Sequence, residues 1–203
     1  MPFPNLDAYR GLIFDLDGTL INSMPFHAEA WIQAAREHGF EIDTRVIYQM
    51  GGVSSRDVVV HFKNQGLPVG DIDEFVKRKV ELYRERLSEV ETFPRVLDIL
   101  LEAYGRGVKI AVGSGTQLIN ARDILRRHHL EDKVAAVVTS EQVSRHKPHP
   151  DTFLLCAEKL GLKPADCLVF EDGPLGLEAA GRAGMDCVEV KDGEFVRLLR
   201  AGG

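Results

Sequence analysis

The chain has 203 residues, of which 44% are hydrophobic and 28% are charged, and its formal net charge at neutral pH is −6. This length supports one substantial hydrophobic core and leaves room for a small inserted domain. Acidic and basic residues are mixed along the sequence, without a run of Lys or Arg long enough to form a basic stripe. We therefore expect neither nucleic acid nor a membrane surface as a partner.

The first residues, Met1 to Pro4, lack the charged start and the apolar stretch of a signal peptide. No later segment is apolar over the length needed to cross a bilayer. We expect a soluble, cytoplasmic protein, and a monomer because no sequence feature marks an obligate interface. The three cysteines are far apart in apolar surroundings, which indicates buried thiols rather than disulfides or a CxxC metal site.

Short apolar segments alternate along the chain with longer segments of helical spacing. We predict strands at residues 11–16, 108–113, 134–139, 167–170 and 187–190. Because these strands are nearly continuously apolar, they suit a parallel sheet covered on both faces, and segments such as 94–104 and 151–160 have the spacing of covering helices. The sequence thus predicts an α/β fold with a doubly wound, Rossmann-like parallel sheet.

A stretch of about 90 residues separates the first predicted strand from the second, far more than one crossover helix requires. Helical spacing within it, at 27–38, 54–65 and 72–87, predicts a small all-helical cap. Polar residues and prolines at 20–25 and 88–94 mark two connections that could act as hinges. We therefore assign residues 1–20 and 92–203 to the α/β core and residues 21–91 to the cap.

Two carboxylates directly follow the first predicted strand, in the segment Asp15-Leu16-Asp17-Gly18-Thr19. In open α/β sheets, ligands bind at the carboxyl ends of strands. Side chains two residues apart on a strand share a face, and Gly18 permits a sharp turn close to a ligand. Both acids could therefore reach one small substrate; the alternative is an ordinary Asp-Gly turn with an exposed carboxylate.

A second acidic pair, Glu171-Asp172, follows the apolar segment 167–170 and precedes Gly173 and a helix. Four carboxylates would then crowd one rim of the sheet, where like charges raise one another's pKa unless a cation lies between them. Oxygen ligands at a phosphate site favour magnesium. We therefore predict a Mg²⁺ site.

Two further segments offer groups that bind a phosphoryl group. Ser114 and the glycines beside it provide a hydroxyl and flexible backbone N–H groups at a helix start. Lys147 lies in a segment that prolines at 148 and 150 make rigid. Alone, a small-residue segment such as that around Ser114 is typical of a helix start, and a lone lysine such as Lys147 is typical of a charge in a solvated loop. Together with both acidic pairs, each at a predicted strand end, they indicate a phosphoryl-transfer site.

These motifs, in this order, resemble those of the haloacid dehalogenase superfamily over nearly the whole chain. The resemblance implies that Asp15 attacks phosphorus to form an aspartyl phosphate, and that Asp17 protonates the leaving oxygen and then activates water. Ser114 and Lys147 would hold the phosphoryl oxygens. Magnesium would be held by Asp15, the backbone carbonyl of Asp17, Glu171 and Asp172.

Within the superfamily, the helical insertion resembles the class with a small cap, which includes β-phosphoglucomutase and bacterial sugar-phosphate phosphatases. Segments 146–157, 170–176 and 179–190 resemble a phosphatase that acts on fructose 1-phosphate and 6-phosphogluconate. We therefore expect a magnesium-dependent phosphomonoester hydrolase that acts on a small phosphorylated metabolite, in particular a sugar phosphate.

A phosphosugar mutase of the β-phosphoglucomutase type is the alternative, because it shares the core chemistry and differs in the cap. The cap segment 51–57 resembles the mutase loop, but Gly51 and Ser55 stand where the mutase has basic residues, and Arg56 is displaced by one position. We rank the mutase second for this reason. The residues expected to contact the substrate are His27, Gly52, Ser55, Arg56 and Gly115, although His27 could equally be a packed or surface histidine.

Other functions are less consistent with the motifs. A dehalogenase does not need a second acid two residues after its nucleophile, so Asp17 argues against it. A non-catalytic binding module would be expected to carry a damaged motif, and every motif is intact. We interpret Lys77-Arg78-Lys79 as a solvated helix face without a role in the site.

Overall fold

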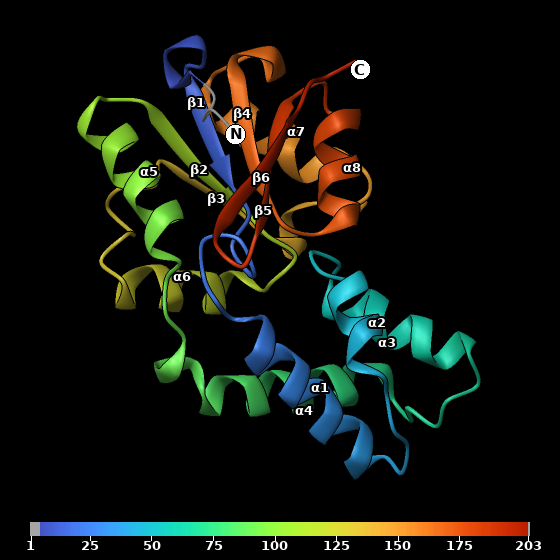
Figure 1. Cartoon of the computed structure of the whole chain (residues 1–203). Coiled ribbons are helices and arrows are strands. Elements are labelled where there is room, and N and C mark those ends of the chain that lie inside the picture. Colours follow the sequence, from blue (N-terminus) through green and yellow to red (C-terminus); the bar gives the residue numbers. More distant parts are fainter. Residues whose placement is uncertain (1–4, 203) are drawn as a thin grey trace.

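A computed structural model describes residues 5–202; residues 1–4 and 203, which the predicted core domain includes, lie outside the described part. Figure 1 shows one sheet with helices on both faces and a group of helices beyond one end of the sheet. The strand order is β3-β2-β1-β4-β5-β6, in which neighbours from β3 to β5 are parallel and β6 is antiparallel to β5. The strands are β1 (Gly11–Phe14), β2 (Lys109–Gly113), β3 (Ala136–Val138), β4 (Cys167–Glu171), β5 (Asp186–Lys191) and β6 (Glu194–Leu199).

The helices divide between the insertion and the sheet. Those of the insertion are α1 (Met24–Glu37), α2 (Thr44–Gln49), α3 (Ser55–Asn64) and α4 (Ile72–Glu85). Those that cover the sheet are α5 (Pro94–Gly105), α6 (Leu118–Arg127), α7 (Asp151–Leu160) and α8 (Pro174–Arg182), with α5 and α6 on one face and α7 and α8 on the other (Figure 1). The prediction of a doubly wound α/β core is confirmed.

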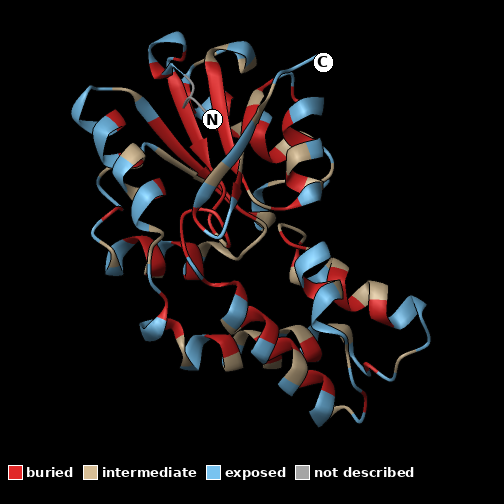
Figure 2. Ribbon diagram, viewed as in Figure 1, coloured by how far each residue is buried: buried red, intermediate tan, exposed pale blue. Residues whose placement is uncertain are grey.

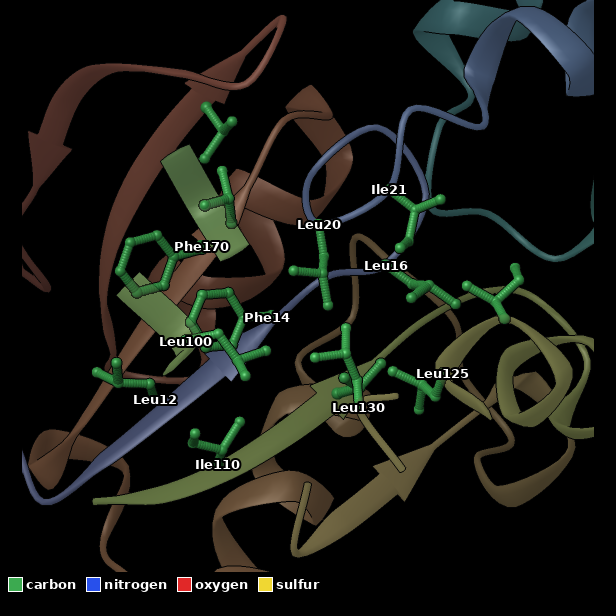
Figure 3. Packing of buried hydrophobic residues seen from close by; sticks show 14 of the residues in the cluster. Leu12, Phe14, Leu16, Leu20, Ile21, Leu100, Ile110, Leu125, Leu130 and Phe170 are labelled. Carbon is green, nitrogen blue, oxygen red and sulfur yellow. The ribbon is translucent and has the colours of Figure 1, made fainter. Parts of the chain in front are cut away.

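The central strands are buried on both faces, as their continuous apolar sequences predicted. In β1, Leu12 and Phe14 pack in the cluster beneath α5 and α6, whereas Ile13 between them packs in the cluster beneath α7 and α8. Figure 2 shows the buried interior running along the strands, and Figure 3 shows Phe14 beside Phe170 of β4. Their rings stack with centroids 4.6 Å apart. Alternating side chains thus supply both cores and hold the carboxyl ends of adjacent strands in register.

Two elements were missed by the sequence interpretation. The short helix α2 has only six residues, too few for a helical spacing of apolar residues to be recognised in the sequence. Asp43 caps its first turn by accepting a hydrogen bond from the Arg45 N–H. The edge strand β6 follows a two-residue turn, Asp192-Gly193, with φ of 50° and 77°. An Asp-Gly turn with both φ values positive is typical of a tight β-hairpin, and this signal was available in the sequence.

The insertion has a hydrophobic cluster of its own, which includes Trp31, Phe62 and Phe75. Its two connections to the sheet run side by side. The Asn22 N–H donates to the Glu91 carbonyl at 2.8 Å, and the Phe93 N–H donates to the Leu20 carbonyl at 3.0 Å. Both connections therefore leave the sheet together, and the four helices extend beyond the carboxyl end of β1 (Figure 1).

Cys156, Cys167 and Cys187 are buried and free, as predicted. Within residues 5–202, the helices are too short or too polar to cross a membrane.

Candidate active site

The candidate catalytic groups lie at the carboxyl ends of three adjacent strands, β2, β1 and β4. Asp15 follows β1 and its backbone N–H donates to the Phe170 carbonyl at 2.9 Å, which extends the β1–β4 pairing to the first acid. Ser114 follows β2, and Glu171 ends β4. Because parallel strands end at the same edge of a sheet, segments far apart in sequence converge here, as predicted.

Lys147 lies at the centre of a buried ion cluster. Its ammonium Nζ donates to Asp15 Oδ1 at 2.6 Å and to Glu171 Oε2 at 2.7 Å, and all three side chains are nearly inaccessible to solvent. Burial alone would lower the pKa of Lys147, but the negative charges of Asp15 and Glu171 outweigh it and raise the pKa. Lys147 is therefore a permanent cation beside the proposed nucleophile.

Three carboxylates, those of Asp15, Glu171 and Asp172, offer oxygens within 4.8 Å of one another. Burial, and next the charge of Glu171, raises the pKa of Asp15 well above its ordinary value and that of Asp172 to about 7. One ammonium cannot balance three carboxylates at this spacing. The excess negative charge and the all-oxygen donor set fit a hard divalent cation such as Mg²⁺.

The backbone at Gly18 is shaped by this carboxylate cluster. Gly18 has φ of 90°, and a Cβ at this position would lie 2.3 Å from Asp172 Oδ2. Asp172 is held there by the Thr19 hydroxyl, which donates to Oδ1 at 2.7 Å. Glycine is required at position 18 both by its left-handed backbone and by the close approach of the Asp172 carboxylate.

Asp17 is surrounded by hydrogen-bond donors. Ser23 donates to its Oδ1 at 2.7 Å, His27 Nε2 lies 3.1 Å from the same oxygen, and the Ser114 hydroxyl lies 3.3 Å from Oδ2. Burial opposes ionisation of Asp17, but the neighbouring His27 and the hydrogen bonds prevail and lower its pKa to about 2. Before substrate binds, Asp17 is therefore an oriented carboxylate.

His27 continues this chain to a buried lysine of the cap. Lys79 Nζ lies 2.8 Å from His27 Nδ1, and the imidazole stacks on Tyr83 with ring centroids 3.8 Å apart. An ammonium can only donate, so His27 Nδ1 accepts and its Nε2 carries the proton directed at Asp17. Burial, and then the Lys79 charge, lowers the pKa of His27, although Asp17 opposes the change.

A cavity of about 50 Å³ lies between the sheet edge and the cap. Asp15, Asp17 and Ser114 face it from the core, and Trp31, Ile47, Met50 and Val58 form an apolar wall opposite them. Of the residues expected to contact substrate, four line this cavity: His27, Gly52, Ser55 and Gly115. Arg56 does not line it; its exposed guanidinium pairs with Asp73 of α4.

The cap loop packs directly on the core at this cavity. Gly52 has φ of 81°, and a Cβ there would lie 2.9 Å from the Lys147 Cδ. A Cβ at Gly115 would lie 2.4 Å from the Gly52 carbonyl oxygen. The cap and the loop of Ser114 and Gly115 therefore meet through backbone, at positions where larger side chains would hold them apart.

The motifs that meet at this edge of the sheet are also found when the sequence is compared with known protein families. The profile of the haloacid dehalogenase-like hydrolase family matches residues 12–190. The chain belongs to this family.

Two curated members of the family are phosphatases of Escherichia coli. Fructose-1-phosphate phosphatase is 35% identical over 91% of this chain and 98% of its own length, and hexitol phosphatase A is 32% identical over 89% and 82%. Among solved structures, β-phosphoglucomutase from Clostridium difficile aligns with a TM-score of 0.82 and 25% identity, over 89% of this chain and 84% of that one. The haloacid dehalogenase-like chain is thus an enzyme of a family that includes phosphatases, as expected.

The structure adds site residues that the sequence interpretation missed, among them Ser23, which donates to Asp17, and the charged residue Lys79. The segment 77–79 was interpreted as a solvated helix face; this is correct for Lys77 and wrong for Lys79, which is 3% exposed and lines the cavity. Its position was recoverable from the sequence, since Phe75, Lys79 and Tyr83 are spaced four residues apart on α4. A lysine between two aromatic residues on one helical stripe faces the same side as they do.

Proposed function

We propose that this chain is a magnesium-dependent phosphomonoester hydrolase that acts on a small sugar phosphate through an aspartyl phosphate on Asp15. The observation that carries the proposal is that the buried Asp15 carboxylate faces the same cavity as Asp17 and Ser114 and is backed by Lys147. A nucleophile, a proton carrier and oxyanion-binding groups therefore converge on the volume of one phosphoryl group.

In the first step, an oxygen of Asp15 would attack phosphorus while the bond to the leaving oxygen breaks. The leaving oxygen takes a proton from Asp17, whose pKa must rise for this role. A phosphate dianion placed beside Asp17 raises that pKa, because like charges disfavour ionisation. In the second step, water attacks the aspartyl phosphate, returns its proton to Asp17 and releases inorganic phosphate and the free Asp15 carboxylate.

The residues suited to hold the cation are Asp15, Glu171 and Asp172, together with the backbone carbonyl of Asp17. When bound, the cation supplies positive charge that allows a phosphate dianion to enter a rim crowded with carboxylates. Lys147 contributes a fixed positive charge beside Asp15 and Glu171, and Ser114 offers its hydroxyl to a phosphoryl oxygen.

Hydrolysis is favoured over the mutase reaction by the charges of the cap. A mutase must bind a second phosphate there, but Arg56 pairs with Asp73 outside the cavity, and Gly51 and Ser55 are uncharged. Among described residues lining the cavity, Lys79 is the one Lys or Arg, and its ammonium faces His27. The two E. coli relatives, named for a sugar phosphate and for hexitols, support a phosphorylated carbohydrate as substrate.

The test is phosphate release from a panel of sugar phosphates, including fructose 1-phosphate and 6-phosphogluconate, with Mg²⁺ and with EDTA. Asp15→Asn keeps the side-chain volume and should abolish release, while Asp98→Asn, an exposed aspartate of α5, serves as the matched control. A coupled assay follows isomerisation of β-glucose 1-phosphate in parallel. Isomerisation without phosphate release would show a mutase, and release that persists in Asp15→Asn would refute the covalent mechanism.

A further inference from the structure

A second cavity, of about 360 Å³, adjoins the proposed metal site on the side away from the substrate. Its walls come from the β5–β6 hairpin, the two hinge connections and the start of the cap. Asp172 and Gly18 line it, whereas Asp15, Asp17 and Ser114 do not. The substrate cavity, in turn, is lined by Asp15 and Asp17 and not by Asp172.

The three carboxylates that suit a cation differ in exposure accordingly. Asp15 and Glu171 are each 1% exposed, whereas Asp172 is partly exposed. A cation that arrives from solvent therefore reaches Asp172 before the other two carboxylates. It does so through the second cavity.

From the substrate side, Asp15 is open to the cavity, whereas the cap loop packs over the segments next to Asp172. The carbonyl oxygen of Gly52 lies against Gly115, and that of Gly51 lies 3.1 Å from the position of a Cβ on Gly173, directly after Asp172. Met24 lines both cavities. With the cap in this position, packed backbone lies between Gly173 and the cap loop, whereas the second cavity reaches Asp172 from the other side.

The charges at the second cavity favour a cation over a phosphate. Its lining carries three carboxylates, Asp172, Glu189 and Asp192, and one ammonium, Lys191. Glu189 is paired with Arg197, so Asp192 at the hairpin turn is the acidic side chain left to act on an approaching ion together with Asp172. An acidic, open mouth attracts divalent cations and repels phosphate dianions.

We infer that the second cavity is a separate entrance for the metal ion, so that the cation exchanges with the cap closed, while the organic phosphate enters from the cap side. This inference rests on the proposed magnesium site. It assigns to Asp192 and Lys191 a role in the rate of metal exchange, and none in hydrolysis once the metal is bound.

The first test measures the exchange of Mn²⁺ without substrate. Mn²⁺ binding is established by electron paramagnetic resonance. Association is followed by stopped-flow mixing of the metal-free protein with Mn²⁺ in the presence of a fluorescent indicator, and release by mixing the loaded protein with an excess of a chelating indicator. Asp192→Asn removes the charge and keeps a residue type that tolerates the positive φ of the turn. Asp98→Asn makes the same change of net charge on α5, outside both cavities.

At low ionic strength, we expect Asp192→Asn to slow Mn²⁺ association by roughly twofold or more and Lys191→Gln to speed it by a similar factor, both effects fading at high salt. The control should match the wild type. The value of kcat/KM for p-nitrophenyl phosphate at saturating Mg²⁺ should not change. A shared entrance predicts instead that Asp192→Asn also improves capture of the phosphate ester, and this result would overturn the inference, as would unchanged Mn²⁺ rates.

The second test locks the cap. His146 Nε2 of the core lies 3.7 Å from Asp57 Oδ2 of α3, so the two side chains face each other across the cap and the core. The double variant Asp57→Cys with His146→Cys, joined by a thiol-reactive cross-linker that a reductant cleaves and verified by mass spectrometry, should lose hydrolysis of p-nitrophenyl phosphate reversibly but still exchange Mn²⁺. Loss of exchange together with hydrolysis would show that the metal needs the cap to open. Failure to bind Mn²⁺ at all would refute the metal site itself.

Discussion

Replacing Lys79 by methionine should stabilise the protein at neutral pH while impairing the site. Burial lowers the pKa of Lys79 from 10.5 to about 8, although Asp17 opposes the change. At about 1.36 kcal/mol for each pKa unit, keeping this ammonium charged in the fold costs about 3 kcal/mol below pH 8. The lost hydrogen bond to His27 offsets about 1 kcal/mol of the gain. The net expectation at pH 7 is a stabilisation of about 2 kcal/mol.

Whether the variant is more or less stable than the wild type depends on pH. Between pH 8 and 10.5 the unfolded chain retains the Lys79 proton and the folded chain does not, so Lys79 makes the wild type more stable as pH rises through this window. The penalty is fully present below pH 8 and disappears above 10.5. The variant lacks this rise, so its advantage should shrink with pH and end as a deficit of about 1 kcal/mol, the lost hydrogen bond.

The assay is urea unfolding of wild type and variant at pH 7, 8, 9 and 10, with the difference in unfolding free energy taken at each pH. Taking the difference removes groups that titrate in both proteins. Lys77→Met, an exposed lysine of the same helix, is the matched control and should show no such trend. A flat difference across the pH range would refute the assignment of a costly buried ammonium. Hydrolysis by Lys79→Met should fall by about 10-fold or more, because His27 and Asp17 lose their fixed orientation.

Two further predictions use neighbouring positions as controls. Gly176→Ala should lower kcat/KM by about 10-fold or more and weaken Mg²⁺ binding, because the new Cβ would lie 2.0 Å from Glu171 Oε2. The control is Gly181→Ala in the same helix, whose new Cβ meets no atom within 4 Å. This control should stabilise α8 by about 0.5–1 kcal/mol. Activity unchanged in Gly176→Ala would contradict the placement of Glu171. Leu100→Ala should lower the free energy of unfolding by about 2–5 kcal/mol, and Leu101→Ala by less than about 1 kcal/mol, because these neighbours are 0% and 38% exposed. Chemical denaturation measures both losses. Equal losses would show that the core face of α5 is wrongly assigned.

Much of the core of this protein follows from local sequence. Continuous apolar strands require a sheet covered on both faces, and such a sheet places every strand end at one edge. Asp15, Ser114 and Glu171 each follow or end a strand, so their convergence is predictable without coordinates. The hairpin strand β6 was also within reach, because Asp192-Gly193 is a turn signal that depends on two residues alone.

The cap side of the site depended on tertiary structure. Whether Lys79 or Arg56 enters the cavity is decided by how α3 and α4 pack on α1, and a residue's charge does not reveal that packing. Lys79 is buried because its stripe of α4 faces Trp31 and His27, whereas Arg56 lies where Asp73 can pair with it in solvent. The sequence by itself determined which residues stand at the ends of the strands, because strand geometry is local. Only the packing of the cap decided that Lys79 lines the cavity of Asp15 and that a second cavity reaches Asp172, because both depend on contacts between segments distant in the chain.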